Sequence, residues 1–450
     1  MFLGILYLYL SIVIGAFLAT VTLIFCGLNW GRLPHLYLQL VSRIQACFPD
    51  PIEYVEPRKY QEHHSSDEND SQDVMEFPVK TIESGLDSIV NGDFGSCFST
   101  APSRHETLLR LKPLAHWSPF QTAIFYLCLL FRVSFLLPVR IALLVSSFVF
   151  VAIAGFYASV KKLTNIEKTW VAIVYCRLFC SGMGLIASYK NMENRPRKPG
   201  VAVANHLTPN DIQILFAGTP HGSSYGYVVT GQKHVGIIGL IEHLVEKLCP
   251  SLWLERKNSN ERQNFLADVL RIAKEEGPVL LFPEGYCSNN TQVLQFRKAA
   301  FEDGINIYPV AIKQNPEYGD GFWFEDEFHT YLLRSMTGWA LVYDIQYLEM
   351  QTRNIGEDNV DFAKRIQCMI AKAADIPVSK YGGNVWYRQQ ERQKLKEAQQ
   401  EENAQTLTQL DDEQQRNNFE QNWTCTTKPI IEHIDSVIDS QYEQLITVYS

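Results

Sequence analysis

The 450-residue sequence predicts an α/β fold, a mixed sheet flanked by helices, with an N-terminal transmembrane segment and a membrane hairpin. Two long apolar runs, 2–29 and 121–160, predict the membrane parts. Short apolar runs that alternate with helix-periodic stretches across 198–376 predict the α/β part. We therefore expect five regions: a transmembrane anchor at 1–29, a polar, partly disordered region at 30–118, a membrane hairpin or two crossings at 119–161, the α/β domain at 162–384 and a polar C-terminal tail at 385–450.

The first apolar run carries no charged side chain between residues 2 and 29. About 20 apolar residues suffice for a helix to cross the hydrocarbon core of a bilayer. A cleaved signal peptide would have a shorter apolar region and a basic start, and nothing basic precedes this run. The sequence therefore favours an uncleaved anchor.

The second apolar run is longer than one straight crossing needs. Pro138 lies near its middle, where proline breaks a helix, and Arg132 and Arg140 would be costly at mid-depth. These residues favour two half-segments folded as a hairpin, with two ordinary crossings as the open alternative.

Basic residues flank both runs, which predicts a cytosolic position for the rest of the chain by the excess of positive charge on the inner side. The basic residues are Arg32, Arg43, Arg104, Arg110, Lys112, Lys161, Lys162 and Lys168.

Overall charge and cysteine content exclude two classes of protein. The net charge of −9 argues against a nucleic-acid binder, because contact with phosphates needs clustered Lys and Arg. The 10 cysteines show no pair of CxxC motifs at zinc spacing, and so long a chain does not need a disulfide scaffold. We expect reduced, buried or membrane thiols.

Within the α/β domain, continuous apolar runs predict buried strands. A helix is predicted over Asn260–Glu276, since apolar residues recur there at helical spacing and Gly277-Pro278 follows. The predicted strands are Val201–Ala204, Tyr227–Thr230, Val279–Phe282, Ile307–Ile312 and Trp339–Tyr347.

The first predicted strand ends at Asn205-His206, and Asp211 follows after a Thr-Pro turn. Such a turn can fold the carboxylate back onto the imidazole, and the pair would then act as a general base. The spacing alone is weak, since His-x4-Asp also arises by chance. A helix-start Asp beside a core His is the structural alternative.

A second candidate segment is Phe282-Pro283-Glu284-Gly285, directly after a predicted strand. Ligands bind outside the carboxyl ends of strands in open α/β sheets, and Gly285 would let the backbone approach a ligand. A plain turn that ends a strand is the alternative.

A third segment, Trp253-Leu254-Glu255-Arg256, brings an arginine to a loop. Guanidinium binds phosphate through two hydrogen bonds, so Arg256 suits a phosphate clamp. A surface arginine paired with Glu255 is the alternative.

These three segments, followed by the Pro-bearing strand Ile307–Ile312, resemble in order the four sequence blocks of the glycerolipid acyltransferase family. The chain is most similar to the endoplasmic-reticulum glycerol-3-phosphate acyltransferases of animals, over about 165–385. FPEGYCSNNTQVLQFRKAAFE (282–302), YPVAIKQNPEYGDGFW and YLLRSMTGWALVYDIQYL carry that likeness. The subgroup typically has Thr in place of Tyr286 and Thr-Ser-Pro-Ile in place of 207–210.

The resemblance implies an acyl-CoA-dependent enzyme that acylates the sn-1 hydroxyl of glycerol 3-phosphate to give lysophosphatidate. His206 would be the general base and Asp211 would orient it. The implied substrate-binding residues are Arg256, Glu284, Gly285, Pro283 and Asn205. Backbone N–H groups near His206 or Gly285 are candidates to stabilise the oxyanion.

The resemblance also implies an endoplasmic-reticulum membrane protein whose partners are acyl-CoA, glycerol 3-phosphate and the lipid bilayer. It implies no metal and no cofactor besides acyl-CoA as co-substrate. Acyl-chain preference and oligomeric state do not follow from it.

Three other functions stay open at this point. A lysophosphatidate or other lysophospholipid acyltransferase would use the same chemistry on a different acceptor. A catalytically silent membrane scaffold could keep the fold, although intact His206, Asp211 and Glu284 argue against it. A metal hydrolase would need a third protein ligand, for which the sequence offers no usual spacing.

Overall fold

The computed structural model describes residues 2–48, 95–98 and 117–383, except 198, 224–225, 233–247, 249–250, 255–258 and 324–327. All of these residues belong to one compact unit of the chain, 1–66 with 93–386. The expected C-terminal tail at 385–450 and most of the polar region lie outside the described residues.

A mixed seven-stranded sheet forms the centre of this unit, in the order β1-β7-β6-β2-β5-β3-β4. Neighbouring strands are parallel except β6 and β7, which pair antiparallel. The strands are β1 (Leu185–Lys190), β2 (Gly200–Ala204), β3 (Val228–Gln232), β4 (Ser251–Leu254), β5 (Pro278–Leu281), β6 (Ile307–Asn315) and β7 (Leu341–Tyr347). The predicted mixed sheet is therefore confirmed.

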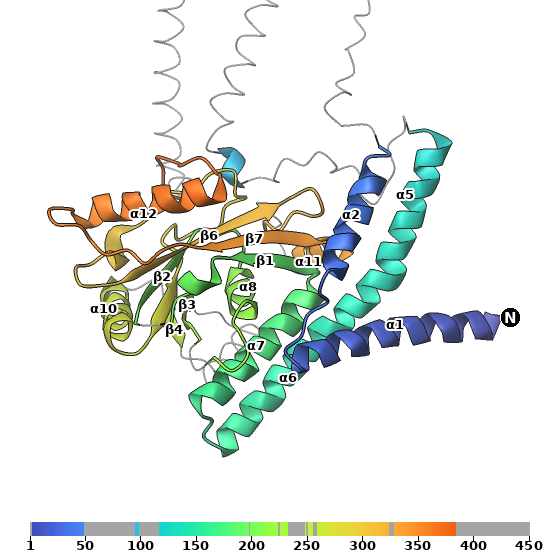
Figure 1. Cartoon of the computed structure of the whole chain (residues 1–450), viewed down its shortest axis with the longest axis horizontal. Helices are drawn as coiled ribbons and strands as arrows, with labels where there is room; N and C mark the ends of the chain where they lie inside the picture. Colours follow the sequence, from blue (N-terminus) through green and yellow to red (C-terminus); the bar gives the residue numbers. More distant parts are fainter. Residues whose placement is uncertain are drawn as a thin grey trace, which may run out of the picture. The chain divides into compact units, whose positions relative to one another are not determined.

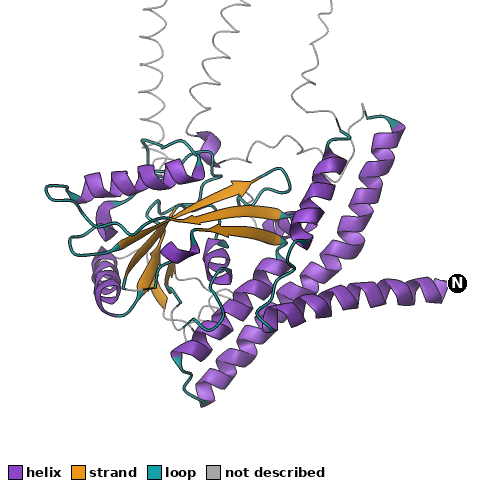
Figure 2. Cartoon of the chain, viewed as in Figure 1, coloured by secondary structure: helices purple, strands orange, loops and turns teal. Residues whose placement is uncertain are grey.

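Helices cover both faces of the sheet (Figure 2). The shorter α8 (Asp211–Ala217) and α7 (Asn165–Gly182) pack over one apolar core, and α10 (Ser259–Glu275) with α12 (Asn359–Ala374) pack over the other. The strand β2 contributes to both cores, because all five of its residues are buried. The carboxyl ends of β2 and β5 thus lie at the centre of a rigid frame.

Helix α7 is a core helix, which settles where its apolar residues lie. Its Thr164 and Glu167 form a reciprocal capping box that fixes the start of the helix. Ile173 and Val174 have no exposed surface, and Leu178 is 1% exposed. Val174 and Leu178 pack in an apolar core of the compact unit.

The first two helices in the described part of the chain are α1 (Phe2–Phe25) and α2 (Leu33–Gln45). The last residues of α1, Ile24 and Phe25, pack against α6 and α7, whereas most of its apolar side chains are exposed. The α2 helix belongs to the region expected to be polar, yet it is docked: Gln45 donates to the carbonyl of Glu317 at 2.7 Å.

The second apolar run is one continuous helical segment (Figure 1), where the sequence had predicted a hairpin or two crossings. It consists of α5 (Pro119–Phe131), a π-helical turn at Arg132–Leu136 and α6 (Leu137–Val160). Pro138 cannot donate to the carbonyl of Ser134, but the Tyr9 hydroxyl of α1 donates to that oxygen at 2.6 Å. This contact gives the Ser134 carbonyl the donor that Pro138 cannot supply.

Two arginines that argued for a hairpin fix this segment to the α/β part. Arg140 donates to the carbonyls of Met336, Gly338 and Trp339 at 2.5–2.7 Å. Arg132 donates to the carbonyl of Thr337 at 3.2 Å. These carbonyls belong to the C-terminal end of α11 (Phe328–Thr337) and the residues after it, where the helix dipole favours positive charge.

Both apolar segments, Leu3–Phe25 and Pro119–Val160, are long and apolar enough to cross a membrane by length and composition. The second has 42 residues. A helix of that length spans about 60 Å, roughly twice the hydrocarbon thickness of a bilayer. The α6 part buries Leu143 and Val151 against the α/β core and exposes an apolar stripe opposite. The stripe consists of Ile141, Val145, Val149, Ile153, Phe156 and Val160.

Candidate active site

His206 and Asp211 meet at the carboxyl end of β2, as the sequence predicted. His206 Nδ1 lies 2.9 Å from Asp211 Oδ2. A carboxylate only accepts hydrogen bonds, so this contact places a proton on Nδ1 and leaves Nε2 as the basic atom. The His206 side chain is 17% exposed and that of Asp211 is fully buried. The geometry is that of a general base open to a substrate on one side.

The turn between the two residues holds the Asp211 carboxylate in place. Asp211 Oδ2 also accepts from the backbone N–H groups of Leu207 at 2.7 Å and Thr208 at 3.0 Å. Together with His206 Nδ1, these two N–H groups give one carboxylate oxygen three donors, which fix its direction toward the imidazole. Asn210, in the same turn, donates to the Tyr331 hydroxyl at 2.6 Å. Sequence analysis missed Tyr331, because nothing in the chain order brings α11 to this turn.

Glu284 joins the two turns at the ends of β2 and β5. Its carboxyl oxygens accept from the backbone N–H of His206 at 3.1 Å and of Leu294 at 3.4 Å. Glu284 is 1% exposed, and burial raises its pKa to about 8, against the opposing effect of the two N–H donors and His206. This geometry favours a positioning role for the carboxyl group over direct contact with substrate.

The ring of His206 lies between an apolar and a sulfur-bearing neighbour. It stacks on Phe282 with 4.1 Å between ring centroids, and it is hydrogen-bonded to the Cys287 thiol. Burial, the largest influence, lowers the pKa of His206, but Cys287 and Asp211 together raise the pKa well above its usual value. The turn after β5 thus brings a thiol within hydrogen-bond distance of the His206 imidazole.

The other predicted substrate-binding residues differ in what they offer. Both polar groups of the Asn205 amide pair with the backbone of Ile312, at 2.8 Å each. Asn205 therefore clamps β2 to β6, a structural use of its side chain. Pro283 is buried, and its carbonyl accepts from the backbone N–H of Arg297 at 3.0 Å.

Gly285 has a φ of +72°, which favours glycine. A Cβ added there would lie 2.8 Å from Arg297 Cζ. The backbone conformation thus favours glycine at this turn, and a larger residue would also displace the Arg297 guanidinium.

The oxyanion donors and the phosphate ligand were also predicted from the sequence. The backbone N–H groups of His206 and Gly285 are already used, by Glu284 and by the carbonyl of Phe282 respectively, so an oxyanion must find other donors. Arg256, the predicted phosphate ligand, lies outside the described residues.

Comparisons with known proteins show which family the chain belongs to. An Acyltransferase family model matches residues 187–313, which include both turns. Glycerol-3-phosphate acyltransferase 3 of Rattus norvegicus is 34% identical over 357 residues, 75% of this chain and 73% of the rat protein. The Xenopus laevis protein of the same name is 36% identical over 68% of each chain. Glycerol-3-phosphate acyltransferase 4 of Homo sapiens is 36% identical over 57% of this chain and 56% of that protein.

Among solved structures, the 1-acyl-sn-glycerophosphate acyltransferase PlsC from Thermotoga maritima matches 52% of this chain and 96% of its own. Its sequence identity of 14% and TM-score of 0.38 are too low to support an argument.

The mixed sheet and the paired turns at its centre, together with the family model, define the class: the chain is an acyltransferase. Its identity to the animal proteins is sufficient to go further. The chain belongs to the family of the glycerol-3-phosphate acyltransferases 3 and 4 of animals. Its described part also contains two helical segments that are long and apolar enough to cross a membrane.

Proposed function

We propose that the protein transfers an acyl chain from acyl-CoA to the sn-1 hydroxyl of glycerol 3-phosphate, giving lysophosphatidate and free CoA. The observation that carries this proposal is the hydrogen bond between His206 Nδ1 and the buried Asp211 carboxylate at the end of β2. The similarity to glycerol-3-phosphate acyltransferase 3 of Rattus norvegicus and of Xenopus laevis supports the choice of acceptor.

In this mechanism His206 Nε2 accepts the proton of the acceptor hydroxyl as its oxygen attacks the thioester carbonyl carbon. Asp211 orients the ring and stabilises the imidazolium that forms. The tetrahedral intermediate then expels CoA as a thiolate, and the thiolate takes the proton from His206. An ordinary thiol has a pKa of about 8.5, so this leaving group does not need a strong acid.

In this proposal Arg256 binds the phosphate of the acceptor. Glu284 and Gly285 shape the part of the site that receives the acceptor. An Arg256→Ala variant should raise the KM for glycerol 3-phosphate with little change in kcat, because phosphate binds equally in the ground and transition states. No cofactor or metal is proposed beyond acyl-CoA as co-substrate. Unchanged turnover in excess chelator is the expected result, and a loss restored by one added metal would refute it.

We also propose that the protein resides in the endoplasmic-reticulum membrane with its α/β part in the cytosol. The exposed apolar side chains of α1 and the α6 stripe support membrane contact, since a water-exposed patch of that size is unusual for a soluble protein. Protease protection of sealed microsomes tests the topology: digestion of the α/β part without detergent is expected.

The test of function is an acyl-transfer assay on purified protein with labelled acyl-CoA and either glycerol 3-phosphate or lysophosphatidate. Transfer to glycerol 3-phosphate that falls about 10²–10⁴-fold in His206→Ala is expected, the usual contribution of a general base. Preference for lysophosphatidate would keep the mechanism and replace the acceptor. Undiminished transfer by His206→Ala would refute the mechanism.

A further inference from the structure

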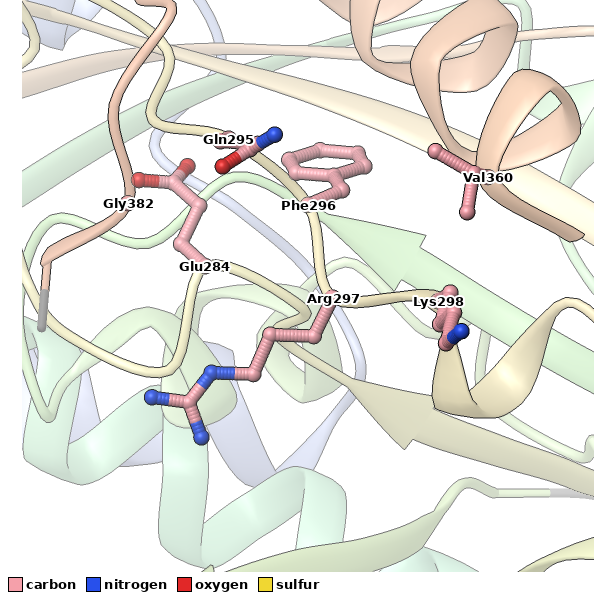
Figure 3. A pocket seen from close by; sticks show the side chains of 7 residues that line it. All are labelled: Glu284, Gln295, Phe296, Arg297, Lys298, Val360 and Gly382. Atoms are coloured by element: carbon pink, nitrogen blue, oxygen red, sulfur yellow. The ribbon is translucent and has the colours of Figure 1, made fainter.

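A pocket of about 260 Å³ opens beside the turn that follows β5 (Figure 3). Its lining combines the end of this turn with the segment after it and the start of α12. The lining residues are Glu284, Gln295, Phe296, Arg297, Lys298, Val360 and Gly382. Two of them, Arg297 and Lys298, carry positively charged side chains.

Arg297 is held against the turn by three contacts. Its backbone N–H donates to the Pro283 carbonyl at 3.0 Å, and its guanidinium lies 5.6 Å from the centre of the Tyr286 ring. The guanidinium also lies over Gly285, where an added Cβ would be 2.8 Å from Arg297 Cζ. The charge therefore has a defined position next to the residues that contact His206, although the side chain is exposed to solvent.

The charge of Arg297 is not balanced by protein. In the described part of the chain, no carboxylate lies within ion-pair distance of Arg297 or Lys298. Other arginines near the start of α12 differ: Arg365 contacts Glu357 at 2.7 Å, and Arg353 contacts Asp303 at 3.3 Å. The Glu284 carboxyl group is directed to backbone donors and away from the Arg297 guanidinium, as Figure 3 shows.

We propose that Arg297 binds the phosphate of the acceptor at the edge of this pocket, beside the turn after β5; the inference rests on the proposed function. A guanidinium offers several N–H donors in one plane and binds a phosphate through two of them. The Tyr286 ring contacts the face of the Arg297 guanidinium, so the N–H groups in the plane of the guanidinium are left for another partner. An anion is the partner that fits these N–H donors.

Two phosphate sources exist in the reaction, the acceptor and CoA. Glycerol 3-phosphate carries its phosphate on the same three-carbon backbone as the reacting hydroxyl. In acyl-CoA, the long pantetheine arm separates the phosphates from the thioester. Because Arg297 touches the turn whose residues Glu284 and Cys287 contact His206, the acceptor is the source that fits.

The experiment compares wild-type protein with Arg297→Gln and Arg297→Lys, using KM for glycerol 3-phosphate and for acyl-CoA. Arg271→Gln is the matched control, because Arg271 is an arginine of α10 that pairs with Glu276 at 3.1 Å. We expect Arg297→Gln to raise the acceptor KM about 10- to 100-fold, with kcat and the acyl-CoA KM nearly unchanged. Arg297→Lys should restore part of the loss, and Arg271→Gln should match wild type.

A second readout does not depend on turnover of a variant. Inorganic phosphate should inhibit competitively with glycerol 3-phosphate, and Arg297→Gln should raise its inhibition constant by a similar factor.

Each contrary result has a distinct meaning. Wild-type protein that does not acylate glycerol 3-phosphate would refute the proposed function itself. Active wild type with an unchanged acceptor KM in Arg297→Gln would refute this inference alone. A rise confined to the acyl-CoA KM would assign the pocket to a CoA phosphate and overturn the acceptor assignment. If Arg297→Gln does not fold, the Arg297→Lys variant and the phosphate inhibition of wild type still decide.

Discussion

The two turns at the centre of the sheet differ in how their charges are balanced. After β2, the Asp211 carboxylate is buried and takes three hydrogen bonds from its own turn and His206. After β5, the guanidinium of Arg297 rests on the turn without a carboxylate partner among the described residues. The first turn is complete in itself and suits proton transfer, whereas the second awaits a ligand of opposite charge. Catalysis and binding are thus separable, and substitutions should separate them.

The largest effect is expected from Asp211→Asn, which keeps the size of the side chain at the first turn. The amide oxygen would still accept from the two backbone N–H groups and from His206 Nδ1, but a neutral amide cannot balance the charge of the imidazolium that forms. We expect kcat to fall about 10²-fold or more with a small change in acceptor KM. Steady-state kinetics measure both constants, with the exposed Asp303→Asn variant as control. A rise in the acceptor KM without a fall in kcat would show that the first turn acts in binding and would contradict the assignment of different roles to the two turns.

Next comes Glu284→Gln, which tests the link between the turns through stability. Because burial raises the folded-state pKa of Glu284 to about 8 from 4.5, the folded state binds the proton more tightly. Stability should therefore fall as pH rises from about 4.5 to about 8, by about 1.4 kcal/mol for each pKa unit at most.

The Gln variant should lose most of that pH dependence in thermal unfolding measured between about pH 5 and about pH 9. Exposed Glu349→Gln is the control and should behave as wild type. An unchanged pH dependence in Glu284→Gln would mean that the carboxyl is ionised throughout.

Cys287→Ala should produce a smaller, directional effect on the first turn. His206 acts as a base only when unprotonated, so kcat/KM should rise with pH through its raised pKa. Removing the thiol removes one cause of the raised pKa, and the acidic limb of the pH profile should shift to lower pH. Complete loss of transfer would instead indicate an acyl-enzyme on Cys287.

The smallest effect is expected at Tyr286, which supports the second turn only. Tyr286→Thr removes the ring under Arg297, a contact of about 0.5–1 kcal/mol at an exposed site. The acceptor KM should rise about two- to fivefold. Tyr286→Phe keeps the ring and is the matched control; equal KM values for the Thr and Phe variants would show that the ring does not position Arg297.

The sequence predicted the local parts of this molecule well. Buried runs such as Val201–Ala204 and the periodic stretch of α10 are determined within a few residues of the chain, and His206 and Asp211 meet because one short turn joins them. The donor that replaces the missing N–H of Pro138 could not be predicted, because it comes from Tyr9, 125 residues from Ser134. The missing partner of Arg297 is likewise visible only when the fold has placed the carboxylates.

Roles at the second turn were harder to predict than positions. The sequence placed Glu284 correctly at the end of β5 and assigned it to substrate. Its orientation toward the N–H of His206 follows from how β2 and β5 pair, which residue spacing does not encode. Asn205 is a similar case, because its amide is taken by Ile312 of β6.

Because α6 packs closely on α7, the chain cannot be truncated between these two helices without exposing a buried surface. Phe148 and Phe179 lie 6.2 Å apart, and Gly182 is in such close contact with the backbone of Leu144 that an added Cβ would lie 2.7 Å from its nitrogen. A chain shortened to begin after Val160 would uncover this face of α7 and lose the two arginines that hold the end of α11. Such a fragment should aggregate when expressed, and a soluble form of the enzyme would have to keep α6 and replace only its outward stripe.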